Sequence, residues 1–134
     1  MPLATIDLLA GRSGDELDAI SDAVHEAMVQ SLGVPERDRF QLITEHRPAT
    51  LRFDRRYLEI ERDERFVLVR VTLARGRTTD AKRQFYERLS ELLAERAGIP
   101  PGDLAVVLVE NDREDWSFGL GQANYLELPR EAWR

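Results

Sequence analysis

The sequence predicts an α/β fold, an α+β sandwich in which two tandem βαβ units share one four-stranded mixed sheet with two helices on one face. Two observations support this prediction. The order strand, helix, strand occurs twice along the 134 residues. The two occurrences also align with each other without a gap, at a fixed offset of 65 residues.

This alignment gives ten identities over 44 positions, whereas about two or three would be expected by chance. The identical pairs are Leu3 and Leu68, Leu8 and Leu73, Gly11 and Gly76, Arg12 and Arg77, Asp15 and Asp80, Glu26 and Glu91, Gly33 and Gly98, Pro35 and Pro100, Asp38 and Asp103, and Glu45 and Glu110. We therefore expect one domain over 1–134, with a duplicated unit (about 1–46 and 66–111), a linker (about 47–65) and a tail (112–134).

The first unit begins with a short apolar strand over residues 1–9. Ser13, with Glu16 three positions later, is typical of a helix start, and apolar residues then recur at helical spacing. Gly33 ends this helix, because a glycine followed by a hydrophobe and a proline suits a left-handed cap. A second strand is predicted at 40–44, parallel to the first because a helix connects the two.

The second unit repeats this order with a strong strand at 66–74. Thr78 or Thr79 caps its helix, Gly98 and two prolines end it, and the last core strand is predicted at 104–109. These two strands carry more apolar side chains than one sheet face can use. Since two helices cover only one face, we predict that other copies of the chain cover the second face in a closed homo-oligomer.

The linker is rich in charge and has apolar residues at alternating spacing, which indicates a hairpin or a lid-like loop. In the tail, Gly119 and Gly121 lie in a turn beside large aromatic side chains, and Trp133 comes near the end. Such a tail usually packs on its own subunit or on a neighbouring one.

Composition narrows the function classes. Hydrophobic residues make up 43% of the chain and charged residues 33%, which is typical of a soluble globular protein. No apolar run is long enough to cross a bilayer and no signal peptide is recognisable, so we expect a cytoplasmic protein without a membrane partner. Without cysteine, and with only His25 and His46, we expect neither a metal nor a cofactor. A net charge of -6 argues against nucleic acid as a partner.

Pro2 is the first candidate for chemistry. If Met1 is removed, Pro2 becomes a secondary amine at the head of a strand, and its lone pair can serve as acid, base or nucleophile. Pro2 aligns with Val67, so the shared fold does not explain the proline. Arg75, which aligns with Ala10, stands out for the same reason.

Two arginines and a carboxylate are further candidates. Arg75 and Arg77 flank a glycine at the predicted carboxyl end of a strand, where α/β sheets commonly bind ligands. Guanidinium groups hold carboxylates in bidentate fashion, although Arg77 can also be a capping or solvated residue like Arg12. Asp38 can activate water or move a proton, but the aspartate at position 103 favours a turn role for both.

Aromatic side chains complete the candidate set. Trp116 and Phe118 lie in a tail segment without a clear counterpart in the first unit. They are either core or interface residues, or they form an apolar wall that excludes water around a small acid. His25 is expected to be structural, and the role of His46 stays open.

In this order, the residues resemble the tautomerase superfamily, and most closely its malonate semialdehyde decarboxylase family. The likeness spans nearly the whole chain. It lies in Pro2 behind methionine, Gly11-Arg12-Ser13, Val34-Pro35 with Asp38-Arg39, His46-Arg47-Pro48, the pair Arg75 and Arg77, and Val109-Glu110-Asn111 leading to Asp115-Trp116-Ser117-Phe118-Gly119.

The resemblance implies a homotrimer with the sheets turned inward and the amino-terminal proline in a pocket at their ends. It implies decarboxylation of a small 3-oxo acid such as malonate semialdehyde to an aldehyde, with hydratase activity beside it. The implied catalytic residues are Pro2, Asp38, Arg75 and Arg77, and the implied substrate-binding residues are Arg75, Arg77, Trp116 and Phe118.

Two alternatives remain at this point. In the first, Pro2 is a neutral base in keto-enol tautomerisation, or an acid in the hydration or dehalogenation of small unsaturated acids. In the second, the chain is a trimeric module that binds partners or small acids without catalysis. Both enzymatic interpretations depend on the removal of Met1, because only then is the nitrogen of Pro2 a free amine.

Overall fold

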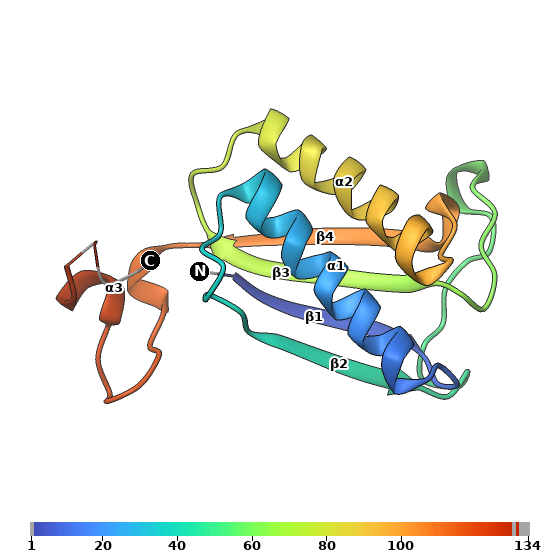
Figure 1. Ribbon diagram of the computed structural model, residues 1–134, viewed down its shortest axis with the longest axis horizontal. Coiled ribbons are helices and arrows are strands. Elements are labelled where there is room, and N and C mark those ends of the chain that lie inside the picture. Colours follow the sequence, from blue (N-terminus) through green and yellow to red (C-terminus); the bar gives the residue numbers. More distant parts are fainter. Residues whose placement is uncertain (1, 130, 132–134) are drawn as a thin grey trace.

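The computed structural model describes residues 2–129 and 131, so Met1 and Trp133 lie outside the described residues. Strands and helices follow the predicted order (Figure 1). They are β1 (Pro2–Leu9), α1 (Gly14–Leu32), β2 (Gln41–His46), β3 (Val67–Ala74), α2 (Thr79–Ala97), β4 (Leu104–Asn111) and α3 (Asn124–Glu127), with short 3-10 turns at Tyr57–Glu59, Pro101–Asp103 and Arg113–Asp115.

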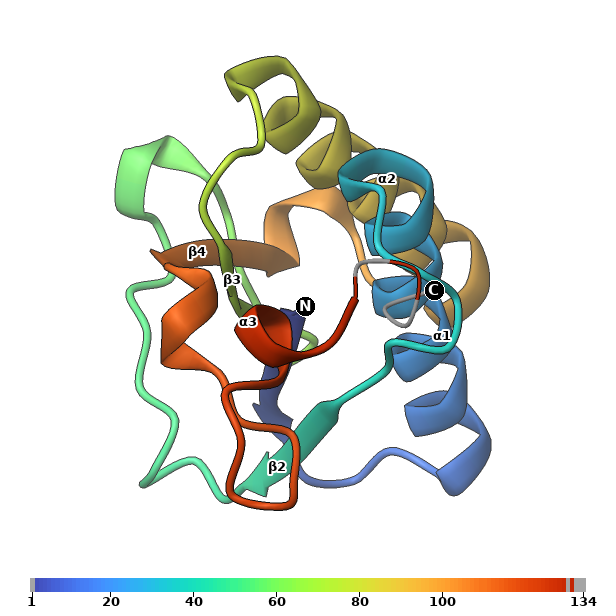
Figure 2. The ribbon, with the colours of Figure 1, turned by 90° about the vertical axis from the view of Figure 1, so that its left-hand side faces the viewer.

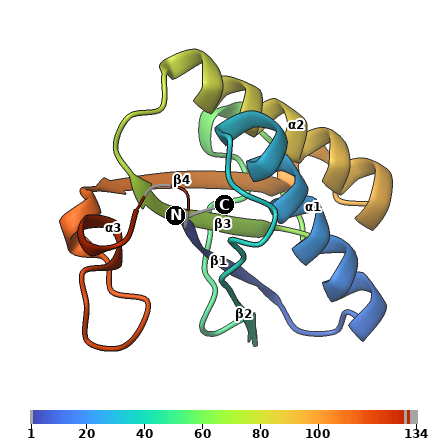
Figure 3. The same cartoon turned by 60° about the vertical axis from the view of Figure 1, so that its left-hand side comes forward.

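The four strands form one mixed sheet in the order β2-β1-β3-β4. β1 and β2 are parallel, β3 and β4 are parallel, and the two units meet through the antiparallel pair of β1 and β3. Both α1 and α2 lie on the same face of this sheet (Figure 3). The predicted fold class is therefore confirmed.

The helices of the two units have the same kinds of caps at their ends. Ser13 and Thr78 are the N-caps, and each side-chain oxygen accepts a hydrogen bond from a backbone N–H three residues later. Gly33 and Gly98 are the C-caps, with φ of 67° and 64°, a left-handed conformation that glycine adopts without strain. The capping signals in the sequence thus belong to the duplicated unit.

The core lies between the two helices and one face of the sheet. Alternate residues of β1 and β3 are fully buried there, as expected for strands with one face on a core. They are Ala4, Ile6, Leu8, Val67, Val69, Val71 and Leu73. Burial of one such larger side chain stabilises the fold by about 1.5–3 kcal/mol.

Neither α1 nor α2 covers the opposite face of the sheet. By strand alternation and register, Leu42 of β2 and Val107 and Val109 of β4 lie on this face, with 57%, 45% and 43% of their surface exposed. We call this surface the open face. Its apolar side chains agree with the expectation of a second apolar sheet face, whereas the oligomer itself stays a prediction.

The linker is a loop, and the hairpin alternative is wrong. Residues 47–66, all of which the structure describes, contain no strand and only one 3-10 turn. Phe53 stacks on Phe66 with 4.3 Å between ring centroids, and the Asp103 carboxylate accepts a hydrogen bond from the backbone N–H of Asp63 at 2.8 Å. Phe53 therefore helps to dock the loop instead of pairing in a strand.

Because β1 and β3 are antiparallel, equivalent parts of the two units lie at opposite ends of the sheet. At one end, the start of β1 lies beside the end of β3, with the tail and α3 in front of them (Figure 2). We call it the Pro2 end. At the other, which we call the Arg12 end, β1 and β2 finish where β3 and the linker meet (Figure 1). Within the described part of the chain, no helix is both long and apolar enough for a membrane span.

Candidate active site

Pro2 opens β1 at the Pro2 end, where it is buried and pairs with Leu73 of β3. Beyond β3, the backbone N–H of Arg75 donates to the carbonyl of Asn111 at 2.7 Å, which extends the pairing of β3 with β4. The antiparallel register thus brings the start of β1 next to the turn that carries both candidate arginines.

Arg77 is half-buried and held by backbone carbonyls. Its Nε donates to Leu32 at the end of α1 at 3.1 Å, and its Nη1 donates to Ala74 at 3.0 Å. Gly76, with φ of 130°, provides the backbone turn before it, in a region that other residues rarely adopt. Arg77 therefore has a structural role, and its Nη2, which makes no hydrogen bond within the described residues, is available to a ligand.

Arg75 differs from Arg77 in its exposure. Its side chain is 62% exposed, and its Nε donates to the Asp112 carboxylate at 3.3 Å. A surface ion pair of this kind contributes little stability and exchanges readily with solvent or ligand. The side chain of Arg75 can thus reorient towards a ligand more readily than that of Arg77.

Asp38 lies in the turn between α1 and β2. Its backbone N–H donates to the carbonyl of Pro35 at 3.0 Å, so the turn role inferred from the sequence is present. Burial raises the pKa of its carboxyl above the ordinary value, and nearby positive charges, including those of His25 and Arg77, oppose this shift. The carboxyl therefore accepts a proton at a higher pH than an exposed aspartate does.

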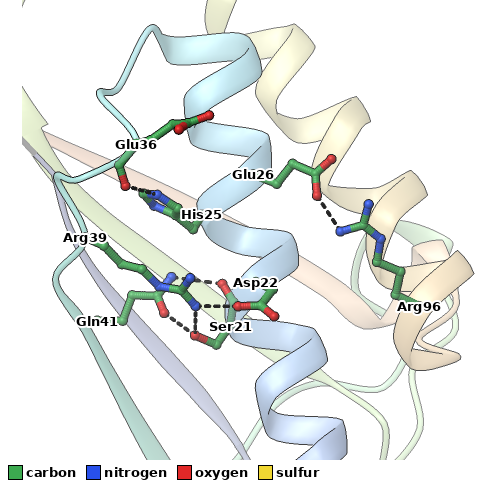
Figure 4. Close-up of polar contacts among 8 residues, drawn as sticks. All are labelled: Ser21, Asp22, His25, Glu26, Glu36, Arg39, Gln41 and Arg96. Carbon is green, nitrogen blue, oxygen red and sulfur yellow. Dashed lines mark hydrogen bonds and ion pairs between the residues drawn. The ribbon is translucent and has the colours of Figure 1, made fainter.

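His25 of α1 helps to fix the segment that carries Asp38 (Figure 4). Its Nε2 donates to the backbone carbonyl of Glu36 at 2.8 Å. Further along the segment, Arg39 donates to the hydroxyl of Ser21 at 2.7 Å. Both contacts join the segment to α1, which agrees with a structural role of His25.

An aromatic cluster forms the apolar wall at this end. Trp116 stacks on Phe118 with 5.5 Å between ring centroids, and Phe118 also contacts Phe40 at 5.8 Å and the edge of Tyr125 at 5.3 Å. The Trp116 indole N–H donates to the side-chain oxygen of Asn111 at 2.7 Å, which ties the cluster to the end of β4. The expected wall of Trp116 and Phe118 thus includes two residues that the sequence analysis missed.

Tyr125 connects this wall with the polar groups. Burial raises the pKa of its phenol well above its usual range, the Asp38 carboxylate raises it further, and Arg77 lowers it. The hydroxyl therefore stays protonated at neutral pH and can donate a hydrogen bond. One signal could have found Tyr125: it lies in the same tail segment, without a counterpart in the first unit.

His46 lies at the other end of the sheet. Its Nε2 is 2.6 Å from the Asp7 carboxylate, and its Nδ1 is 3.1 Å from the Thr50 hydroxyl. The structure therefore does not bring it to the Pro2 end. It does bring Pro2, Asp38 and the arginine turn there, together with the aromatic wall.

The sequence matches models of known protein families. A family model described as a tautomerase enzyme matches residues 38–119, and a second one with that description matches residues 2–54. The chain belongs to the tautomerase superfamily. The family predicted from the sequence motifs is confirmed.

Two relatives of this superfamily member are the probable tautomerases YrdN and YusQ of Bacillus subtilis (strain 168). They are 38% and 34% identical to the chain, and the matches cover 94% and 95% of it and 97% and 100% of the relatives. The likeness therefore extends over whole proteins rather than over a shared fragment.

Solved structures of the superfamily are also similar to this chain over most of its length. Malonate semialdehyde decarboxylase, crystallised in wild-type, mutant and inactivated forms, is 39% identical with a TM-score of 0.86, over 92% of this chain and 95% of the other. FG41 malonate semialdehyde decarboxylase inhibited by 3-bromopropiolate is 38% identical with a TM-score of 0.87, over 92% and 94%. A symmetric trimer of fused 4-OT is 23% identical and shares the fold, with a TM-score of 0.75 over 93% and 98%.

Proposed function

We propose that this protein is an amino-terminal-proline enzyme that decarboxylates a small 3-oxo acid such as malonate semialdehyde, with hydration of a small unsaturated acid as a second activity. One observation carries the proposal: Pro2, Asp38 and the turn with Arg75 and Arg77 meet an aromatic wall at one end of the sheet. The identity of 38–39% to two malonate semialdehyde decarboxylases supports the substrate class.

The chemistry requires that Met1 is removed, so that Pro2 has a secondary amine. As the bond between the carboxylate carbon and the neighbouring carbon breaks, its electron pair moves into the adjacent carbonyl group while CO2 leaves. A protonated Pro2 stabilises the negative charge that develops on that carbonyl oxygen. Alternatively, a neutral Pro2 amine adds to the carbonyl carbon and the oxygen leaves as water, which gives an iminium that accepts the electron pair. Protonation of the resulting enolate on carbon gives the aldehyde. On the iminium route, the enamine is protonated on carbon and water then hydrolyses the iminium, which releases the aldehyde and the Pro2 amine.

The arginines and the aromatic wall have different roles in binding the substrate. Arg75 and the Nη2 of Arg77 bind the substrate carboxylate, which fixes its orientation to the carbonyl group. Binding alone stabilises the ground state, so the apolar wall of Trp116 and Phe118 must favour the neutral CO2 over the carboxylate. Asp38 keeps Pro2 protonated, or activates water in the hydration reaction.

Keto-enol tautomerisation is the second candidate, and the similarity to two probable tautomerases favours it. In this reaction, a neutral Pro2 moves a proton between the enol oxygen and the carbon next to the carbonyl group. The arginines and desolvation lower the pKa of a Pro2 amine, whereas the carboxylate of Asp38 raises it. A pH-rate profile that follows a deprotonated amine would favour tautomerisation over decarboxylation.

Assays with two substrates, malonate semialdehyde and phenylenolpyruvate, separate these candidates. We expect the wild type to turn over malonate semialdehyde, and Pro2→Ala to lose about 100-fold or more of that rate. Equal turnover by both proteins would exclude the proline mechanism, and turnover of neither substrate would favour a non-catalytic binding module. Borohydride trapping tests the iminium, and mass mapping after 3-bromopropiolate treatment tests Pro2 as the modified residue.

A homotrimer closed around the open face is part of this proposal. The exposed apolar side chains of Leu42, Val107 and Val109 support it, since a second copy can bury them. Val107→Glu places a carboxylate in that contact, so we expect native mass spectrometry to detect monomers. Tyr86→Glu on α2, whose side chain is exposed outside the open face, is the control and should leave the trimer intact. A monomeric wild type would contradict the trimer.

A further inference from the structure

The Arg12 end has a cleft that the proposed reaction does not use. Its volume is about 620 Å³. It lies where β1 and β2 end, between the first turn of α1 and the residues before β3. The lining residues that bear on its chemistry are Ala10, Arg12, Glu16, Arg47, Glu64 and Arg65.

The internal duplication relates this cleft to one at the Pro2 end. There, a cleft of about 450 Å³ is lined by Arg75 and Asp112, among others. At the offset of 65 residues, their counterparts are Ala10 and Arg47, which line the cleft of the Arg12 end. Backbone geometry agrees, because the N–H of Ala10 donates to the carbonyl of His46 at 2.8 Å, as its counterpart in the second unit does at 2.7 Å.

The charges of the two clefts differ. At the Pro2 end, Arg75 has a carboxylate partner within the protein, Asp112, at 3.3 Å. At the Arg12 end, the position of this aspartate holds Arg47, so that an additional cation replaces the internal counter-ion. The side chain of Arg47 is exposed and makes no hydrogen bond or ion pair with the described residues.

Arg12 is the second available cation of this cleft. It is half-buried, and its Nη2 donates to the backbone carbonyl of Arg65 at 2.9 Å. Its Nε and Nη1 make no hydrogen bond with the described part of the chain. A backbone carbonyl thus orients Arg12 without neutralising it, as two carbonyls do for its counterpart Arg77.

The other charged groups around the cleft are mostly engaged. Arg65 pairs with Asp63 at 2.6 Å, and Glu16 accepts a hydrogen bond from the Ser13 hydroxyl at 3.3 Å. The imidazole of His46 is bonded to the Asp7 carboxylate at 2.6 Å. Glu64 is exposed and is the remaining acidic group of the lining.

We propose that the Arg12 end binds a small organic carboxylate between Arg12 and Arg47, at a site separate from the Pro2 end. Each guanidinium offers the planar, forked donors that match a carboxylate, and the two come from different strand ends. The site binds without turnover, because Val67 stands where the other end has Pro2. This proposal rests on the geometry of one end and is independent of the reaction at the other.

Amide-resolved NMR titration with malonate tests it, with Arg75→Ala as the background so that the Pro2 end is weakened. We expect saturable shifts at the amides of Gly11 and Glu64. Arg47→Ala in that background should weaken this binding by about tenfold or more, since a charge-assisted contact is lost. Arg56→Ala, which removes an exposed arginine of the same linker outside the cleft, should leave it unchanged.

Three outcomes would overturn the proposal. They are the absence of saturable shifts at the Arg12 end, equal shifts with chloride at matched ionic strength, and unchanged affinity in Arg47→Ala. Because Arg47 is exposed, its replacement should not unfold the chain, and a thermal unfolding curve checks this. Arg47→Glu is a second variant, which should abolish the titration by charge reversal.

Discussion

Asp38 and Asp103 occupy the same place in the two βαβ units, yet they have different surroundings. Asp103 is 2% exposed and accepts a hydrogen bond from a backbone N–H of the linker, with the Arg65 guanidinium 3.9 Å away. Asp38 is half-buried near Arg77 and Tyr125. The Asp103 carboxylate thus holds the linker in place, whereas the Asp38 carboxylate lies at the candidate site.

The same contrast applies to the two ends of the sheet as a whole. Their backbones are nearly equivalent, as the φ values of 126° for Gly11 and 130° for Gly76 illustrate. What differs is a few side chains, above all Pro2 in place of Val67 and Arg75 in place of Ala10. The duplicated fold therefore has the candidate catalytic residues at one end of the sheet only. Substitutions at equivalent positions of the two ends can test this difference.

The largest expected effect comes from the two aspartates. Asp38→Asn should lower kcat by about 100-fold to 10,000-fold, because an amide cannot exchange protons. Asp103→Ala should leave kcat unchanged and lower the free energy of unfolding by about 1–3 kcal/mol, since a part-buried linker N–H loses its acceptor. Steady-state kinetics and urea unfolding of both variants measure this. Equal loss of activity in both would remove the distinction between the two carboxylates.

A somewhat smaller effect is expected when the Pro2 end receives the residue of the other end. Arg75→Ala should lower kcat/KM by about tenfold to 200-fold, because a hydrogen bond to a charged group is worth about 1.5–3 kcal/mol. The unfolding curve should not change, since the side chain is 62% exposed. Arg83→Ala, with a side chain 75% exposed on α2, is the matched control. A similar small loss in both variants would argue against carboxylate binding by Arg75.

How well the sequence predicts the molecule depends on how local each signal is. Helix caps such as Ser13 and Gly33, and the offset between the repeats, are local or periodic features, and they led to the correct fold. The linker was ambiguous because alternating apolar residues also suit a docked loop, as Phe53 on Phe66 shows. Strand pairing depends on a partner, which a single segment does not specify.

The candidate site shows the same limit. Pro2, Asp38 and the arginine turn could be selected because the repeat distinguishes them or the family motif includes them. Phe40 and Tyr125 were missed, since they join the site only when the tail folds back onto the segment before β2. The repeat alone does not separate Asp38 from its counterpart, because burial and neighbours, not residue type, set the difference.

A modest effect is expected for Tyr125, which has no counterpart at the Arg12 end. Tyr125→Phe keeps the ring contact with Phe118 and removes the hydroxyl beside Asp38. We expect kcat/KM to fall by about twofold to tenfold, in line with the loss of one neutral hydrogen bond. An unchanged kcat/KM would assign Tyr125 to the wall alone.

The smallest effect concerns pH and stability. Because burial raises the pKa of Asp38 in the folded protein, the folded state binds more protons than the unfolded chain between the ordinary carboxyl pKa of 3.8 and the raised one. The free energy of unfolding should therefore fall as pH rises through this window. Urea unfolding should show this fall for the wild type, and the Asp38→Asn variant should lack that component. Identical pH profiles would contradict the raised pKa.

We propose that the amine of Pro2 makes the Pro2 end the catalytic one. Intact-mass measurement of an active sample tests it most directly, combined with the turnover of malonate semialdehyde by the same sample. We expect chains that lack Met1 and a rate that scales with the fraction of such chains. Full activity in a sample in which every chain retains Met1 would contradict it, because the nitrogen of Pro2 would then lie in a peptide bond.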